Sequence, residues 1–287
     1  MNALLDCVVC QQRQALRLAR LVTQDPSLHE QIMREAMSYL AQRNWDTDPM
    51  TITIGLYAII ERLTGNSDPY KTLKVQSNQE ALACYSQVQT YLRNSLDPLF
   101  TACKLAAAGN IMDFGAKDEF NLQETIQHVL KTDFAINHYD RFTAALAQAS
   151  NILVFADNAG EIVFDKLLFE TLLDRYPSLK ITMVVKALPI INDATMLDVK
   201  QVGLDRLPNI EFRTINARAN GNGNSAWMPA EVKEWIREHD MVLSKGQANY
   251  EIMNVVPGMF FLLIAKCPII GRETGTYVGA YIFKHSS

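Results

Sequence analysis

The stretch Asn151-Ile-Leu-Val-Phe-Ala-Asp-Asn-Ala-Gly-Glu-Ile-Val-Phe-Asp165 decides the fold class of this sequence. Its first six residues form a short apolar run, which is typical of a buried strand, and the residues from Glu161 to Arg175 have the pattern of a helix. A second apolar run follows at Lys180–Lys186. Strand, helix and strand within 151–186 match one βαβ unit, which takes roughly 30 residues or more.

The same alternation continues toward the end of the chain. Apolar strands separated by helices favour a mainly parallel sheet that is covered on both faces. We therefore predict that residues 149–287 form a Rossmann-like three-layer α/β/α domain. The further strands are expected at 210–215, 240–244, 259–265 and 277–283, with a helix over 229–238.

The first half of the chain is predicted to be helical throughout. Ala15–Val22 places apolar residues at intervals of three and four, as an amphipathic helix must. Pro49 and Pro98 each follow an aspartate, and we expect each of them in the first turn of a helix. Residues 1–148 are therefore expected to form an all-helical domain. Its other helical stretches are expected at 27–42, 50–63, 78–94 and 95–108.

Charge and composition exclude several classes of protein. The chain has 27 basic and 31 acidic residues, so its net charge of −4 argues against a nucleic-acid surface as its main function. The apolar stretch Met259–Ala265 is far too short to cross a bilayer, and the N-terminus lacks a basic lead-in. Five cysteines, an odd number, indicate a reducing compartment. We therefore expect a cytoplasmic protein that binds neither nucleic acid nor membrane.

Polar side chains follow several of the predicted strands, at the edge where open α/β sheets bind their ligands. Asp157 and Asn158 follow the first strand, and Asp193 follows the second. Carboxylate and amide oxygens are the ligands that hard cations such as Mg²⁺ and Mn²⁺ prefer. Lys245, after a later strand, would suit a phosphoryl group beside such an ion. The other polar residues at these strand ends are Glu161, Asn192, Gln247, Asn249, Glu251 and Lys266.

The turn after the first strand has two other interpretations. Asp157-Asn-Ala-Gly160 before a helix is also an ordinary helix cap and turn. Carboxylates on two neighbouring strand ends, with a lysine on a third, favour a metal site over capping alone. A dinucleotide site would need Gly-x-Gly-x-x-Gly, whereas this turn has a single glycine.

Six blocks of sequence, spread over nearly the whole chain, carry a resemblance to a known family. Those in the first half are Cys7-Val-Val-Cys10, Asp68-Pro-Tyr70 with Lys74 and Asn78, and Ala108-Gly-Asn-Ile-Met-Asp113. Those in the second half are Ile152–Asp165, Leu188–Thr195 and Ser244–Glu251. Together they resemble the damage-control phosphatases, a family long catalogued as a domain of unknown function. The blocks of the first half are similar to its prokaryotic Cys-x-x-Cys subfamily.

This resemblance implies a helical domain on an α/β/α domain, a bound divalent metal ion and hydrolysis of small phosphate monoesters. By position, the metal ligands would be Asp157, Asn158 and Asp193. Mn²⁺ is the expected ion, with Mg²⁺, Co²⁺ and Ni²⁺ as alternatives. The expected partner is a small phosphorylated metabolite, such as a sugar phosphate or a damaged metabolite phosphate. Substrate contacts are expected from Asn110, Asp113, Glu161, Lys245, Gln247, Asn249, Glu251 and Lys266.

The residues themselves leave alternatives open. One is an S-adenosylmethionine-dependent carboxyl methyltransferase, which is consistent with a Rossmann-like sheet and with the name of one branch of the family. Another is a non-catalytic metal- or redox-sensing module centred on Cys7 and Cys10, to which Cys103 or Cys267 could be added in space. Asp157 could also act as a nucleophile, although a role as metal ligand is preferred. The oligomeric state cannot be predicted from the sequence.

Overall fold

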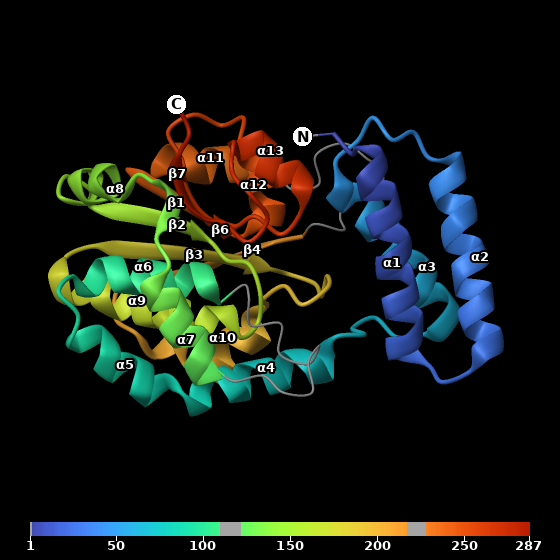
Figure 1. Ribbon diagram of the computed structural model, residues 1–287, viewed down its shortest axis with the longest axis horizontal. Helices are drawn as coiled ribbons and strands as arrows, with labels where there is room; N and C mark the ends of the chain where they lie inside the picture. Colours follow the sequence, from blue (N-terminus) through green and yellow to red (C-terminus); the bar gives the residue numbers. More distant parts are fainter. Residues whose placement is uncertain (1, 110–121, 217–227) are drawn as a thin grey trace.

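The computed structural model describes residues 2–109, 122–216 and 228–287, and it has an α/β architecture (Figure 1). Seven strands in these ranges form one sheet in the order β1-β7-β6-β5-β2-β3-β4, and all neighbours are parallel except β6 and β7. The strands are β1 (Phe134–Asn137), β2 (Asn151–Phe155), β3 (Lys180–Lys186), β4 (Ile210–Ile215), β5 (Met241–Lys245), β6 (Phe260–Ile264) and β7 (Tyr281–His285).

Helices cover both faces of the sheet. A large core joins one face to α4 (Lys71–Ala83), α5 (Tyr85–Arg93), α6 (Pro98–Ala108), α7 (Leu122–Lys131), α8 (Tyr139–Leu146), α9 (Glu161–Arg175) and α10 (Met196–Val202). A second core joins the other face to α11 (Ala230–Glu238), α12 (Gln247–Met253) and α13 (Pro268–Thr274). A short 3-10 helix, Leu204–Arg206, follows α10. The central strands β5 and β6 are buried along their whole length, which explains their almost continuous apolar sequence.

Three aspartate–proline pairs determine where three of the helices begin. Pro26, Pro49 and Pro98 occupy the first turns of α2 (Pro26–Gln42), α3 (Pro49–Thr64) and α6. The preceding aspartates accept hydrogen bonds from backbone N–H groups of the first turn, which would otherwise lack a partner. The predicted positions of Pro49 and Pro98 are thus confirmed.

The first three helices form a unit beside the layered part of the molecule (Figure 1). In α1 (Leu5–Val22), Leu18 and Ala19 share a small core with Ile32, Tyr57 and Ile60, and a second small core joins Ala15 to Ala36 and Leu56. By contrast, α4 to α8 share their core with the sheet. No helix in the described ranges is both long and apolar enough to cross a membrane.

The expectation of an entirely helical segment before residue 149 is wrong at β1. Phe134–Asn137 is a strand that pairs in parallel with β7 at the edge of the sheet. It is only four residues long, which is too short for an alternating pattern to stand out. The helix expected over 78–94 is also divided, because α4 ends at Ala83 and α5 starts at Tyr85.

Asp97 provides a test of how the helices on the sheet are anchored. Its side chain caps α6. The Tyr139 hydroxyl also donates to this carboxylate and lies 2.9 Å from each of its two oxygens. Asp97→Ala should lower the free energy of unfolding by about 2–4 kcal/mol, because it removes a cap and a hydrogen bond to a charged group. Asp25→Ala, which removes a cap alone, should cost about 1 kcal/mol in the same urea titration. Equal losses would show that Tyr139 contributes nothing to this anchor.

Candidate functional site

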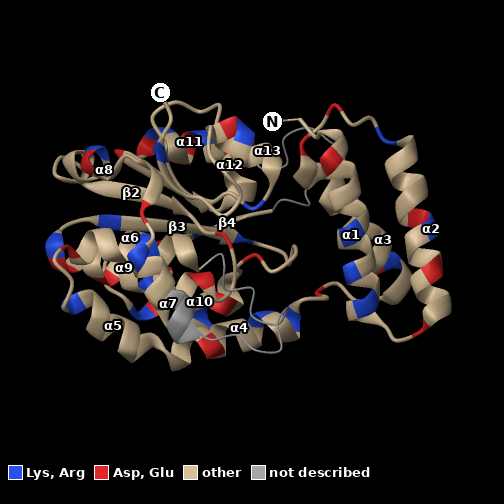
Figure 2. Ribbon diagram, in the orientation of Figure 1, with Lys and Arg blue, Asp and Glu red and all other residues tan. Residues whose placement is uncertain are grey.

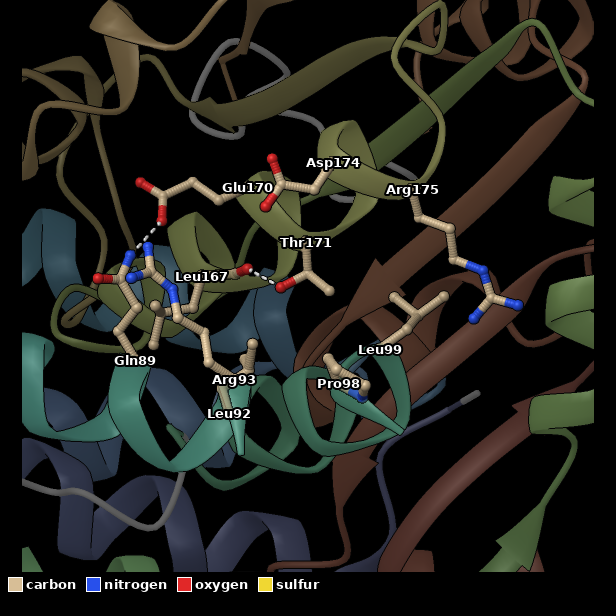
Figure 3. Close-up of a pocket in the computed structure, with 10 residues that line it drawn as sticks. All are labelled: Gln89, Leu92, Arg93, Pro98, Leu99, Leu167, Glu170, Thr171, Asp174 and Arg175. Carbon is tan, nitrogen blue, oxygen red and sulfur yellow. Dashed lines mark hydrogen bonds between the residues drawn. The ribbon is translucent and has the colours of Figure 1, made fainter. Parts of the chain in front are cut away.

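A cavity of about 740 Å³ lies between α1, the start of α3 and the loops that follow β2, β3, β5 and β6. Asp157, Asn158 and Asp193 line its sheet side, and Arg13 and Arg17 line its α1 side. A second pocket, of about 360 Å³, lies between α5, the start of α6 and α9, and holds none of the predicted site residues that the structure describes (Figure 3). The larger cavity, at the carboxyl ends of the strands, is therefore the candidate site.

The loops after β2 and β3 are joined through their backbones. Asn158 and Asp193 form an isolated antiparallel bridge, and the Ala194 N–H donates to the Asp157 carbonyl at 2.8 Å. The Asn158 Nδ2 donates to Asp157 Oδ2, also at 2.8 Å. These contacts bring all three predicted metal ligands together, and all three residues are buried.

The residues present fit a hard divalent cation. Two carboxylates and one amide are oxygen donors of the kind that Mn²⁺ and Mg²⁺ bind. Gly246 leaves the space that Asp157 occupies, because a Cβ at this position would lie 1.9 Å from Asp157 Oδ2. The described residues hold no metal-binding group of three or more His, Cys, Asp or Glu side chains. The site therefore depends on the Asn158 amide as its third ligand.

Charge is concentrated in the wall behind Asp193. Burial, with a contribution from Asp157, raises the pKa of Asp193 to about 7, and the nearby ammonium groups of Lys186 and Lys74 oppose this shift. The Lys186 Nζ lies 3.7 Å from Asp193 Oδ2. Burial lowers the pKa of Lys186 itself.

Lys245 does not line the cavity. Its Nζ donates to Glu161 Oε1 at 2.8 Å, to Asp165 Oδ1 at 2.5 Å and to the Ala106 carbonyl at 2.8 Å, and its side chain has no exposed surface. Side chains alternate along a strand, so Lys245 points with Leu243 toward α6 and α9, whereas Ser244 points to the other face and contacts Met253. This geometry does not fit the expectation that Lys245 contacts a phosphoryl group.

Glu161 belongs to the same buried cluster and does not line the cavity either. Burial raises the pKa of Glu161 to about 8, although Lys245 opposes this shift. Burial lowers the pKa of Lys245, but Asp165 and Glu161 outweigh it, so the net shift is upward. The ammonium is thus held in its charged form between two carboxylates.

The other expected substrate contacts have different positions. Gln247, Glu251 and Lys266 line the cavity, and the Gln247 side chain donates to Glu251 Oε1 at 2.8 Å and accepts from the Lys266 N–H at 2.7 Å. Burial raises the pKa of Glu251 to about 7. Asn249 instead donates to the backbone carbonyls of Ala156 and Lys245, and so braces the ends of β2 and β5. Asn110 and Asp113 lie outside the described residues.

Asn78 is a site residue to which sequence reasoning assigned no role. Its Oδ1 accepts the Gly160 N–H at 2.6 Å, and its Nδ2 donates to Asp198 Oδ1 at 3.0 Å. Asp198 in turn accepts from the N–H and the hydroxyl of Thr195, just after the Asp193 loop. Asn78 therefore connects the loops of both predicted carboxylate ligands. Its membership of a family block was the only signal in the sequence, because Gly160 is 82 positions away.

The cysteine pair lies closer to the candidate site than its sequence position indicates. Cys7, Cys10 and Cys267 line the cavity, whereas Cys103 is buried within α6. Burial raises the pKa of both Cys7 and Cys10, which disfavours their reactive thiolate forms.

Comparison with known proteins gives matches over nearly the whole chain. Residues 3–282 match the family model of the damage-control phosphatase ARMT1-like domain. A damage-control phosphatase of Pyrococcus horikoshii is 29% identical over 282 residues, covering 96% of each chain. Another, of Archaeoglobus fulgidus, is 30% identical over 278 residues, covering 93% of each. The crystal structure of a DUF89 family protein from Pyrococcus horikoshii has a TM-score of 0.87 and 28% identity, with full coverage of both chains. This likeness confirms the predicted fold class.

Lys245→Met separates a structural role of this lysine from a role in substrate binding. The change leaves two buried carboxylates without their cation, so the free energy of unfolding should fall by about 3–5 kcal/mol. Lys266→Met removes an exposed lysine of the cavity and should change the free energy of unfolding by less than about 0.5 kcal/mol. Chemical denaturation of both variants measures the difference. If Lys245→Met were as stable as Lys266→Met but had lost turnover, a phosphoryl contact would be the correct role.

Proposed function

This chain belongs to the family of ARMT1-like damage-control phosphatases, and we propose that it hydrolyses small phosphate monoesters with a divalent metal ion held by Asp157, Asn158 and Asp193. Family membership confirms the predicted reaction class of phosphatase. The metal, with Mn²⁺ as the first candidate, and the substrate class of sugar phosphates or damaged metabolite phosphates are our proposals.

One observation carries the proposal of a metal site. The carboxyl ends of two neighbouring parallel strands deliver two carboxylates and an amide to one cavity wall, and backbone hydrogen bonds hold the two loops together. A merely capping role for Asp157 does not explain this convergence, because Asp193 comes from a different strand. The cavity, with a volume of about 740 Å³, is also of the usual size for a small-molecule site.

In the proposed mechanism, different residues of the described part of the chain hold the metal ion, position its ligands and bind the phosphoryl group. A divalent ion, when bound, polarises a phosphoryl oxygen and lowers the pKa of bound water. Asp157, Asn158 and Asp193 would hold it, and the Asn78 hydrogen bonds would fix the distance between their loops. The phosphoryl contact that was expected of Lys245 is assigned instead to Lys266, which is exposed in the cavity. A positive charge there would stabilise the negative charge on the phosphoryl oxygens.

The methyltransferase alternative fits the α/β sheet and the name of one family branch, but two observations oppose it. The turn after β2 has only Gly160, and the chain's family and named relatives are phosphatases. The proposed partner is a small phosphorylated metabolite. A rise in melting temperature with Mn²⁺, and none with S-adenosylmethionine, would agree with this choice.

Asp157→Ala and Asp193→Ala test the metal ligands. Each variant removes one of two carboxylates, so Mn²⁺-dependent hydrolysis of p-nitrophenyl phosphate should fall by about 10³-fold or more, equivalent to about 4 kcal/mol. The rise in melting temperature that Mn²⁺ gives the unaltered protein should also disappear. Asp205→Ala, which removes an exposed carboxylate, should leave both readouts unchanged. Full activity of either ligand variant at saturating Mn²⁺ would reject the assignment.

Gly246→Ala tests the space around the Asp157 carboxylate. Gly246 and Gly258 both have a positive φ, of 81° and 82°, but of the two only Gly246 has atoms within 4 Å of an added Cβ. Gly258→Ala should lose about 1–2 kcal/mol of stability from backbone strain, and Gly246→Ala should lose more, because its Cβ also displaces the Asp157 carboxylate. Only Gly246→Ala should also weaken Mn²⁺ binding, by at least about tenfold or about 1.4 kcal/mol. Titration of both folded variants with Mn²⁺ decides this, and equal affinities would contradict it.

A further inference from the structure

We propose that the cavity side of α1, through Arg13 and Arg17, binds a second anionic group of the substrate. The substrates would then be phosphate monoesters that carry a further carboxylate or phosphate. This inference rests on the proposed function, because the first anionic group is the phosphoryl group at Asp157, Asn158 and Asp193. It assigns a binding role to two arginines that lie in none of the family blocks.

The two arginines are placed together by the helix. Arg13 and Arg17 are four residues apart, so their side chains lie one above the other on the same face of α1. Both are exposed, and both line the cavity that contains the strand-end residues. Figure 1 shows α1 outside the layered part, facing it from the side of the first three helices, and Figure 2 shows basic residues along α1.

Tyr70 supports Arg17 from the neighbouring segment. The Arg17 guanidinium carbon lies 5.8 Å from the centroid of the Tyr70 ring, and the Tyr70 hydroxyl accepts a hydrogen bond from Gln14 Nε2 at 3.1 Å. Tyr70 also lines the cavity. A guanidinium over an aromatic face presents its planar N–H groups at its edge, the direction from which carboxylates and phosphates bind. The α1 side is thus a supported cationic surface rather than a single mobile side chain.

The size of the cavity leaves room for a substrate that extends beyond the reacting phosphoryl group. The cavity has a volume of about 740 Å³. A metal ion and a phosphoryl group fill only a small part of such a space, since a single water takes roughly 30 Å³ of liquid volume. The remainder of the substrate therefore contacts the other walls. On the α1 side these walls present two guanidinium groups, which bind carboxylate and phosphate through paired hydrogen bonds.

The acidic residues that line the cavity in the described part of the chain have other contacts or assignments. Asp157 and Asp193 are assigned to the metal ion. Asp6, at the start of α1, has its carboxylate 3.8 Å from the Arg272 guanidinium. Glu251, on α12, accepts a hydrogen bond from the Gln247 side chain. α1 itself thus contributes two guanidinium groups to the cavity wall.

A matched pair of substrates tests the inference. Sorbitol 6-phosphate and 6-phosphogluconate differ at one end, where the second has a carboxylate instead of a CH₂OH group. With Mn²⁺, the unaltered protein should have a kcat/KM for 6-phosphogluconate at least about tenfold higher, which corresponds to one charge-assisted contact. The double change Arg13→Gln with Arg17→Gln should abolish this preference, mainly by raising KM for 6-phosphogluconate. Arg20→Gln, on the same helix but outside the cavity lining, should keep it.

Equal losses for the two substrates would overturn the inference, since the arginines would then contact the reacting phosphoryl group. An absence of preference in the unaltered protein would overturn it as well. Calorimetric titration of both compounds without a divalent ion gives a readout that does not depend on turnover. Tighter binding of 6-phosphogluconate, lost in the double variant and kept in Arg20→Gln, would uphold the inference even if no phosphate ester were hydrolysed. That last outcome would refute the proposed function alone, and equal binding of both compounds would refute the inference alone.

Discussion

The buried ion pair of Lys245 with Glu161 and Asp165 constrains the whole sheet end of the molecule. Taking three charges out of water is costly, and only close contacts between them offset that cost. The ammonium also reaches the Ala106 carbonyl, so β5, α6 and α9 are tied at one point. Gly109 permits this, because a Cβ there would lie 2.9 Å from the Glu161 Cα. Since Glu161 begins α9, the turn that carries Asp157 and Asn158 is fixed from behind.

A second set of contacts fixes the same turn from the side. Asn78 joins the start of α9 to Asp198, and the Lys74 ammonium lies 3.3 Å from Asp68 and 3.7 Å from Asp198. All of these side chains are buried or nearly so, and charge-assisted contacts in such surroundings are strong only when every partner is in place. The cavity side of the strand ends is therefore held by groups that do not themselves line it. Preorganised sites of this kind are what phosphoryl transfer requires.

The sequence predicted the helices and strands whose signals lie in neighbouring residues. It did not predict a very short strand or contacts between residues that are far apart in the chain. The apolar runs at β2 and β3 and the Asp–Pro starts of α3 and α6 were readable because neighbouring residues carry them. β1 was not predicted because its four residues, at the edge of the sheet, are too few to show a clear alternation of apolar and polar side chains. The prediction for Lys245 was wrong because the strand continues one residue past Ser244, and the lysine side chain therefore points to the face covered by α6 and α9. Arg13 and Arg17 carry no signal of function in the sequence, because the polar face of a helix is usually solvent-exposed, and only the folded chain sets them against a cavity.

The two walls of the cavity belong to parts of the molecule that differ in the size of their hydrophobic cores. Its sheet wall belongs to a large core, whereas its α1 wall belongs to three helices with two small cores of their own, which reach a core of the sheet through Met50 of α3. Units of this kind open at lower free energy than the core to which they are attached. Heating should then separate the two walls of the binding site before the sheet unfolds. A ligand that contacts both walls would stabilise their association. The temperature at which activity is lost would thus report on the helices, not on the fold as a whole.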